Sequence, residues 1–328
     1  MSPEKLTQLA KLYYVDGMTQ EDLAARFSMS RVMVGRLLKR AVKEGVVEIR
    51  VRLRHPPEQT QALENALIER FGIQRAIISV DHKDLDSQRD LLAGLVAGYL
   101  DHTLTDSSIV AVGMGRNVSA VSKHAVSAQQ RNCSFVCAIG GSYRGGEAMN
   151  ADHICRHLAL RFGGDSVTLY APAMVSDERS RSNLLENDTV RQSLSKAQRS
   201  DIALVGVGDI LEDSNMVRMG WFTADEIKAV RELGAVGDIM GYDFIDIHGR
   251  LANTQLAGRV IGLTLEDLRR IPNVIAIASE PTKVTGILGA LRTGAINTLA
   301  TTQSIAQTVL SLAQATEAPR PAAASKEA

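Results

Sequence analysis

The segment at residues 19–43, TQEDLAARFSMSRVMVGRLLKRAVK, restricts the fold of its part of the chain more than any other stretch does. Thr19 and Ser30 each stand just before a helical pattern, where a hydroxyl can accept hydrogen bonds from free backbone N–H groups. Asp22 follows Thr19 by three residues, as in a capping box with a shorter acid than the usual glutamate. Ser28 and Met29 mark a tight turn between the two predicted helices. Apolar residues at helical spacing give the two helices a common inward face: Leu23, Phe27, Val34, Leu37 and Leu38.

The outward face of the second predicted helix is basic, which is typical of a DNA-binding helix-turn-helix. We expect Arg31 and Arg36 to read bases, because arginine can pair bidentately with guanine edges. Lys39, Arg40 and Lys43 suit phosphates. The full set of expected DNA contacts is Thr19, Gln20, Ser30, Arg31, Val32, Met33, Gly35, Arg36, Lys39 and Arg40. The alternative interpretation is an ordinary helical hairpin with a solvated basic face.

The distribution of charge supports a nucleic-acid contact through the N-terminal part alone. The whole chain has 37 Lys and Arg residues and 37 Asp and Glu residues. Residues 1–54 carry eleven basic and six acidic side chains, a net charge of +5, so the remainder carries −5. A basic N-terminal segment (the head, residues 1–54) joined to an acidic remainder (the body) fits DNA binding by the N-terminal segment.

Two elements are expected on either side of this segment. Residues 5–16 predict a helix that backs the two-helix unit and ends at Gly17. Its apolar stripe consists of Leu6, Leu9, Ala10, Tyr13 and Tyr14. After Gly45, the sequence VVEIRVRLR alternates apolar and charged residues and predicts a strand. Its arginines, Arg50, Arg52 and Arg54, belong either to a wing that touches the phosphate backbone or to an edge strand with solvated side chains.

Pro56-Pro57 predicts the boundary between two domains. We expect a helix-turn-helix DNA-binding domain at residues 1–55 and a larger second domain at 56–316. Residues 317–328, rich in Ala, Pro, Glu and Lys, are expected to form a disordered tail. The helix predicted at 57–71 has a narrow apolar seam at Leu63 and Leu67, which either helps to pair two heads or packs on the helix's own body domain.

From Gln74 onward, short apolar strand patterns alternate with helical patterns. This order predicts an α/β fold with a mostly parallel sheet covered by helices on both faces. The predicted strands are RAIISV, SIVAVGMG, SFVCAIGG, DIALVGVG, NVIAIAS and INTLAT, in chain order.

Three of these strands end in glycines, which suggests a small-molecule pocket. Loops at the carboxyl ends of parallel strands are where open α/β sheets bind ligands, and nearby helix starts offer N–H groups to an anion. The glycines are Gly113 and Gly115, Gly140 and Gly141, and Gly206 and Gly208. The alternative is that they only allow tight turns.

Several other classes of site are not supported by the sequence. GMGRNV at residues 113–118 lacks the third glycine of a dinucleotide fingerprint, and the chain has neither a P-loop nor a Gly-x-Ser-x-Gly elbow. Cys133, Cys137 and Cys155 are expected to be small buried apolar groups rather than metal ligands. His153 and His157 would need a third partner to hold a metal. We therefore expect no metal site and no cofactor.

The order of motifs resembles the SorC family of bacterial sugar-responsive transcription regulators, over nearly all of residues 5–315. The resemblance is carried by GMTQEDLAARFSMSRVMVGRLLKRAVKEGVVEI at 17–49, VAVGMGRN at 110–117, DIALVGVG at 201–208, GAVGDIMGYDFIDIHG at 234–249, VIGLTLEDLRRIPNVIAIAS at 260–279 and KVTGILGALRTGAINTLATT at 283–302. It implies a winged-type helix-turn-helix domain at the N-terminus and, at residues 56–316, a sugar-binding effector and oligomerisation domain with a three-layer α/β fold similar to sugar-phosphate isomerases. It also implies dimers or tetramers on operator DNA and a sugar, polyol or sugar phosphate as effector.

Two pocket positions are carried over from this resemblance. Asp246 matches an acidic residue that binds effector hydroxyls in related regulators, and Lys283 matches a lysine after the strand ending in IAIAS. A carboxylate accepts hydroxyl hydrogen bonds and an ammonium supplies three donors, although a surface ion pair is the alternative. The expected effector contacts are Gly113, Gly115, Arg116, Asn117, Gly140, Gly141, Asp246, Glu280 and Lys283.

The sequence also departs from the family pattern. Asn117 and Val118 stand where a Thr or Ser usually begins the helix, and Ser279-Glu280-Pro281 replaces Gly-Gly before the lysine. A lost hydroxyl and an added acid favour an unphosphorylated sugar or polyol. Arg116 or Arg144 could restore an anion site.

Together these features predict a DNA-binding transcription regulator of a carbohydrate or polyol operon, gated by a small effector and acting as a homodimer or homotetramer. The alternative is an isomerase- or deaminase-like enzyme with an added DNA-binding head. The three cysteines show no disulfide framework and Glu4-Lys5 lead directly into a helix, so we expect a cytoplasmic protein. The longest apolar run, at residues 91–100, is too short to span a membrane.

Overall fold

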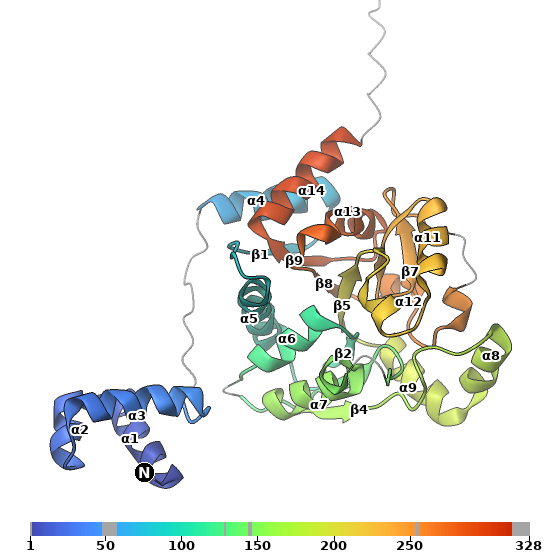
Figure 1. Cartoon of the computed structure of the whole chain (residues 1–328). Coiled ribbons are helices and arrows are strands. Elements are labelled where there is room, and N and C mark those ends of the chain that lie inside the picture. The colour runs from blue at the N-terminus through green and yellow to red at the C-terminus, as the bar shows by residue number, and fades with distance from the viewer. Residues whose placement is uncertain (1, 48–57, 128, 144–145, 253–255, 317–328) are drawn as a thin grey trace, which may run out of the picture. The chain divides into compact units, whose positions relative to one another are not determined.

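The computed structural model describes residues 2–47, 58–127, 129–143, 146–252 and 256–316. The chain divides into two compact units, Met1–Pro56 and Pro57–Ala328 (Figure 1). The strand expected after Gly45 falls largely outside the described residues, as does the expected tail at 317–328. Each unit has its own hydrophobic core.

Within residues 2–47, the smaller unit has three helices: α1 (Pro3–Tyr14), α2 (Gln20–Arg26) and α3 (Arg31–Lys43). The predicted caps are confirmed: Thr19 and Asp22 form a complete capping box on α2, and the Ser30 side chain accepts from the Met33 N–H. Ser28 turns the chain with a φ of 51°. The buried core contains Leu6, Leu9, Ala10, Leu23, Val34, Leu37, Leu38 and Ala41.

The prediction that Tyr14 belongs to the inward-facing apolar stripe of α1 is wrong. Tyr14 is 41% exposed, and its ring instead meets the edge of the Tyr13 ring at 4.9 Å between centroids. Leu6 and Leu9 already fill the space beneath the helix, and α1 ends at Tyr14 before another turn could cover that side chain.

The larger unit is built on a sheet whose main strands all run parallel, in the order β1-β9-β8-β5-β2-β3-β4. A hairpin of β6 and β7 pairs antiparallel with the end of β5. The strands are β1 (Arg75–Ser79), β2 (Ile109–Val112), β3 (Ser134–Cys137), β4 (Asp165–Val167), β5 (Ile202–Gly208), β6 (Ala235–Ile239), β7 (Asp243–Asp246), β8 (Asn273–Ile277) and β9 (Thr298–Thr302). The α/β prediction is confirmed, and the sequence patterns had missed β4, β6 and β7.

Helices cover both faces of this sheet. Figure 1 shows β1 and β9 between α4 and α14 on one side and α5 on the other, and these helices contact the two strands. The α-helices are α4 (Glu58–Phe71), α5 (Leu85–Thr103), α6 (Arg116–His124), α7 (Ala151–Phe162), α8 (Glu178–Glu186), α9 (Asp188–Gln198), α10 (Asn215–Arg218), α11 (Ala224–Glu232), α12 (Leu265–Arg270), α13 (Val284–Arg292) and α14 (Gln303–Ala315). Short 3₁₀ turns lie at Glu147–Met149, Ala257–Arg259 and Pro281–Lys283.

Helix α4 packs on its own unit rather than presenting a seam for another chain. Leu67 has no exposed surface, and Leu63 packs against the same core. The helix contacts β1 and α14. The interpretation that Leu63 and Leu67 pair two heads is therefore wrong, because the side chains it needs are already used within the body unit.

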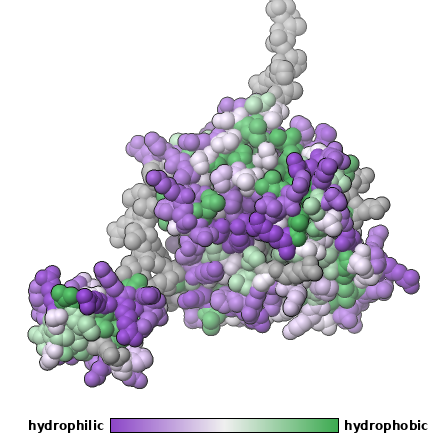
Figure 2. Space-filling view, in the orientation of Figure 1, coloured by the Kyte–Doolittle hydropathy of each residue, from purple (hydrophilic) through white to green (hydrophobic). Residues whose placement is uncertain are grey.

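The face of the larger unit shown in Figure 2 is mostly hydrophilic, with hydrophobic side chains in smaller groups. In the described part of the chain, no helix is long and apolar enough to cross a membrane.

Candidate functional site

A cavity of about 290 Å³ lies in the larger unit at the carboxyl ends of neighbouring parallel strands. Residues just after β2, at the end of β5 and just after β8 form its floor: Gly115, Gly206, Gly208 and Glu280. Strands β2, β5 and β8 are adjacent in the sheet, so their ends meet at the same edge. This edge is where open α/β sheets bind ligands.

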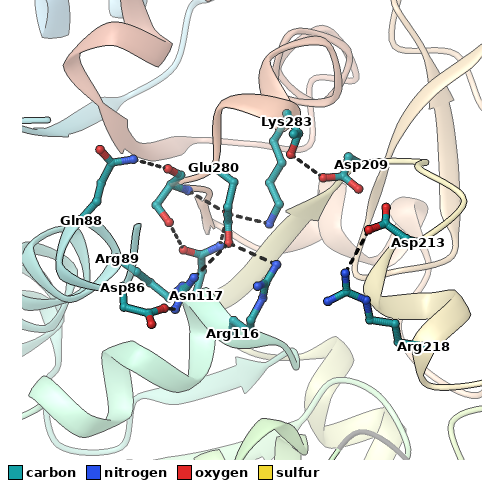
Figure 3. Close-up of polar contacts among 12 residues, drawn as sticks. Asp86, Gln88, Arg89, Arg116, Asn117, Asp209, Asp213, Arg218, Glu280 and Lys283 are labelled. Carbon is teal, nitrogen blue, oxygen red and sulfur yellow. Dashed lines mark hydrogen bonds and ion pairs between the residues drawn. The ribbon is translucent and has the colours of Figure 1, made fainter. Parts of the chain in front are cut away.

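Glu280 is the centre of the polar contacts in this cavity (Figure 3). Its Oε2 accepts a hydrogen bond from Asn117 Nδ2 at 2.8 Å and forms an ion pair with Lys283 Nζ at 3.0 Å. Its Oε1 lies 3.7 Å from an Arg116 nitrogen and 3.6 Å from an Arg89 nitrogen. One carboxylate thus faces three cations that come from three different parts of the chain.

A second set of bonds fixes the position of this carboxylate. Ser279 Oγ donates to Asn117 Oδ1 at 2.7 Å, and Gln88 Nε2 donates to the Ser279 carbonyl at 2.6 Å. Asn117, Ser279 and Gln88 are all buried. The asparagine that replaces the family's hydroxyl residue is therefore the side chain that orients Glu280, and the two departures from the family pattern are physically coupled.

The protonation of Glu280 follows from these contacts. Burial of the carboxyl opposes ionisation, but Lys283, Asn117 and Arg116 outweigh it and lower the pKa of Glu280 to about 2. The residue is therefore a full negative charge at any physiological pH. It is a poor general base, since a useful base has a pKa near the working pH.

Asp238 is a second buried carboxyl at this cavity, and the sequence reasoning did not select it. Its Oδ1 accepts from the Gly241 N–H at 2.6 Å, while its Oδ2 has no hydrogen-bond partner among the described residues. Burial raises its pKa to about 7, against the opposing effects of the Gly241 bond and of the Lys283 charge. The available signal was the sequence GAVGDIMGY at 234–242, which places an acid directly after Gly237 and three residues before Gly241.

Part of the cavity lining is apolar. It includes Met216, Met219, Trp221 and Met240, from α10, the residues after it and the end of β6. The Trp221 indole N–H donates to Ser142 Oγ at 3.2 Å, which fixes the ring at the wall. A lining that combines apolar and polar groups suits a ligand with one hydrophobic and one hydroxyl-bearing face. Trp221 is the single tryptophan of the chain.

Five of the nine predicted effector residues line this cavity: Gly115, Arg116, Asn117, Glu280 and Lys283. Gly113, Gly140, Gly141 and Asp246 do not line it. The structure adds Arg89, Asp209, Trp221 and Asp238, among others. Arg144 falls outside the described residues.

Four glycines that we expected to contact the effector do not offer free N–H groups to a ligand. The N–H of Gly113 donates to the Leu204 carbonyl, that of Gly140 to Ile261 and that of Gly141 to Ala171. Gly115 lines the cavity but its N–H donates to the Met149 carbonyl. These bonds hold the strand ends together. The first residues of α6 line the cavity, and no side chain caps this helix start. The first N–H groups of a helix have no intrahelical acceptor.

The structure also corrects the placement of Asp246. Its Oδ1 accepts from the His248 and Arg250 N–H groups at 2.8 and 2.9 Å, which closes the turn after β7. In the hairpin, Asp246 lies opposite Ala235, at the other end of β6 from Asp238. The carboxylate carried over from the family resemblance is therefore part of a turn rather than of this cavity.

The smaller unit presents the predicted basic face on α3. Arg31, Val32, Met33, Arg36, Lys39 and Arg40 are exposed, whereas Gly35 is half-buried. Arg31 pairs with Glu21 at 2.9 Å and Arg40 pairs with Glu44 at 2.7 Å. Within the described residues, Arg36 and Lys39 have no such partner. The Thr19 and Ser30 hydroxyls are engaged as helix caps.

All three cysteines are buried and free. Cys137 Sγ lies 3.9 Å from Cys155 Sγ, between β3 and α7. No group of three or more metal-ligating side chains is present in the described part of the chain.

The chain is similar to known transcription regulators and to their sugar-binding domains. The family model described as "Putative sugar-binding domain" matches residues 55–311. The transcriptional regulator LsrR of Enterobacter sp. (strain 638) is 29% identical over 319 residues, which cover 94% of each chain. A solved sugar-binding domain of a transcriptional repressor from Vibrio fischeri is 49% identical, with a TM-score of 0.73, and covers 77% of this chain and 99% of its own. The full-length sorbitol operon regulator SorC from Klebsiella pneumoniae is 26% identical, with a TM-score of 0.74, over 94% of this chain and 99% of its own.

Proposed function

Because this chain belongs to the SorC-type family of transcription regulators with a sugar-binding domain, we propose that it binds operator DNA and controls a carbohydrate or polyol catabolic operon. The effector is a sugar, polyol or sugar phosphate that binds in the cavity of the larger unit. The named relatives are regulators, which supports a regulatory role over the isomerase-like alternative.

One observation carries this proposal: a single chain holds an exposed basic helix on one compact unit and a polar, partly apolar-walled cavity on the other. DNA binding accounts for the first feature, since an enzyme has no use for unpaired cations on an outward helix face. Binding of a small hydroxyl-bearing ligand accounts for the second. The arrangement lets the ligand state of one unit influence the DNA affinity of the other.

The proposed effector contacts combine the confirmed lining residues with those the structure adds. Asp238 and Glu280 accept hydroxyl hydrogen bonds, Lys283 and Arg116 donate to ligand oxygens, and Trp221 supports the apolar face of the ligand. The DNA contacts come from the exposed face of α3, with Arg36 and Lys39 in the leading roles.

The ligand-binding part of this proposal is tested with the full chain and a panel of sugars, polyols and their phosphates. A ligand at 100 times its dissociation constant stabilises the fold by about 2.7 kcal/mol, which raises the thermal midpoint measurably. The same compound must change operator affinity, because coupling between two sites is reciprocal. The function is contradicted if a compound that binds the cavity leaves operator affinity unchanged.

We also propose that the chain acts as a homo-oligomer. One short recognition helix contacts few base pairs, and symmetric pairing lets two heads bind half-sites separated by whole helical turns. Light scattering of the full chain at micromolar concentration is expected to give at least a dimer. A monomer in both the free and the DNA-bound state would rule out this assembly. Leu63 and Leu67 are not part of the proposed interface.

A further inference from the structure

The charges that line the cavity nearly cancel one another. Four of its side chains are basic and four are acidic: Arg89, Arg116, Arg218 and Lys283, and Asp209, Asp213, Asp238 and Glu280. Asp238, with a pKa of about 7, is only partly ionised at neutral pH, so the cations exceed the ionised acids by less than one charge. A phosphate ester carries close to two negative charges at neutral pH, which this small excess does not balance.

Each of the four cations also has a carboxylate within ion-pair distance. Lys283 and Arg116 pair with Glu280, and Arg218 pairs with Asp213 at 3.0 Å. Arg89 lies between Asp86 at 2.6 Å and Glu280 at 3.6 Å. Three of these four cations share Glu280, so this one carboxylate takes the position that an anionic ligand group would otherwise occupy (Figure 3).

Two carboxylate oxygens at the cavity are buried without a hydrogen-bond donor among the described residues. They are Asp238 Oδ2 and Glu280 Oε1. A buried acceptor without a donor is unfavourable, so a ligand that brings donors gains from meeting them. Hydroxyl groups are such donors, whereas an ionised phosphate has only acceptor oxygens. Glu280 Oε1 belongs to a carboxylate that stays ionised, so it favours hydroxyls and disfavours phosphate. Asp238 Oδ2 has the same preference when Asp238 is ionised.

We infer that the effector is an uncharged polyhydroxyl compound, an alditol or an unphosphorylated sugar, and that Glu280 determines this specificity. Glu280 neutralises Lys283, Arg116 and Arg89 and excludes the phosphate ester of the same compound. Asn117 and Ser279 hold the carboxylate in that position. The inference rests on the proposed function, because it assigns the chemical class of the ligand that this cavity binds.

Glu280→Gln is the variant that removes the negative charge of Glu280 with little change in shape. The amide has nearly the shape of the carboxylate, so the packing against Asn117 and Ser279 is kept while Lys283 and Arg116 become free for an anion. Asp246→Asn is the matched control. It removes one negative charge from the same unit, outside the cavity, and its remaining oxygen can still accept from both N–H groups that close the turn.

The test compares matched ligand pairs: erythritol with erythritol 4-phosphate, ribose with ribose 5-phosphate, and sorbitol with sorbitol 6-phosphate. Trp221 fluorescence and calorimetry report binding to the full chain. The wild type is expected to bind the neutral member of at least one pair at least tenfold more tightly. In Glu280→Gln, the affinity for the phosphorylated member relative to that for the neutral member should rise at least tenfold. In Asp246→Asn, this ratio of affinities should stay as in the wild type.

A competition experiment on the wild type keeps the test independent of how well the variant folds. Inorganic phosphate at millimolar concentration is expected not to displace the bound polyol. Displacement by phosphate, tighter wild-type binding of the phosphorylated members, or an unchanged ratio in Glu280→Gln would each overturn the specificity. If no member of any pair binds, the carbohydrate-sensing function itself fails. If the phosphorylated compounds bind and alter DNA affinity, the inferred specificity for neutral compounds is contradicted while the proposed regulatory function stands.

Discussion

Arg36→Ala is expected to weaken binding of the full chain to its operator by about 5- to 150-fold, since a bidentate arginine–guanine pair contributes about 1–3 kcal/mol of discrimination. Arg36 is exposed on α3. It has no ion-pair partner in the described part of the chain, so no carboxylate must be displaced before it contacts a base. Arg31 would first have to leave Glu21, although an exposed pair of this kind is weak. The operator is obtained by selection from random duplexes with the full chain, and affinity is then measured on operator and unrelated DNA.

Lys39→Ala is the matched control, because Lys39 lies on the same exposed face and is equally unpaired among the described residues. A lysine on phosphate contributes without regard to sequence, so this variant should weaken both DNAs alike. It should also reduce the slope of log affinity against log salt by about one. Arg36→Ala should weaken the operator more than the unrelated DNA. Equal weakening of both DNAs by Arg36→Ala would contradict its assignment to base reading.

The head was predictable in detail because its determinants are local. Caps at Thr19 and Ser30 and the apolar spacing from Leu23 to Leu38 depend on neighbours within a few residues, and the structure confirms them. Tyr14 shows where local periodicity fails. The pattern indicates which face of a helix is apolar, but not where the opposing surface stops.

The parallel sheet was predictable for a different reason. Strands buried on both faces, such as β5 and β8, have sequences that are short apolar runs between helical patterns. The β6–β7 hairpin was missed because it is added to the end of β5 and has a mixed, glycine-containing sequence. Since Asp238 lies on that hairpin, missing the hairpin also meant missing Asp238.

The cavity was only partly predictable because its residues are distant in sequence. Glycines at strand ends located the correct edge of the sheet, but their N–H groups turned out to bond to neighbouring strands and loops. Arg89 on α5 and Trp221 after α10 carry no sequence signal for this position. Asp246 and Asp238 both lie within the motif at 234–249, and only the hairpin register separates them.

Asp238→Asn is expected to remove much of the pH dependence of stability of the ligand-free protein. The pKa of Asp238 rises from 3.8 to about 7 on folding, mainly because of burial. The folded state therefore binds more protons than the unfolded state between these values, and stability falls as pH rises through that window. From pH 5 to pH 8 the fall in stability corresponds to about two pKa units, or roughly 2–3 kcal/mol.

An asparagine in this position cannot ionise, and its oxygen can still accept from the Gly241 N–H. The free energy of unfolding of the variant, relative to that of the wild type, should therefore rise by about 2–3 kcal/mol between pH 5 and pH 8. Urea unfolding followed by Trp221 fluorescence measures this difference.

Asp243 is the natural comparison, because burial also raises its pKa to about 7 while it lies outside the cavity. Asp243→Asn should flatten the pH profile to a similar extent but retain polyol binding. At pH 8, where Asp238 of the wild type is ionised, Asp238→Asn should lose polyol affinity as well, since it replaces an acceptor oxygen with a donor. An Asp238→Asn profile parallel to that of the wild type would show that this carboxyl is not held in its neutral form by the fold.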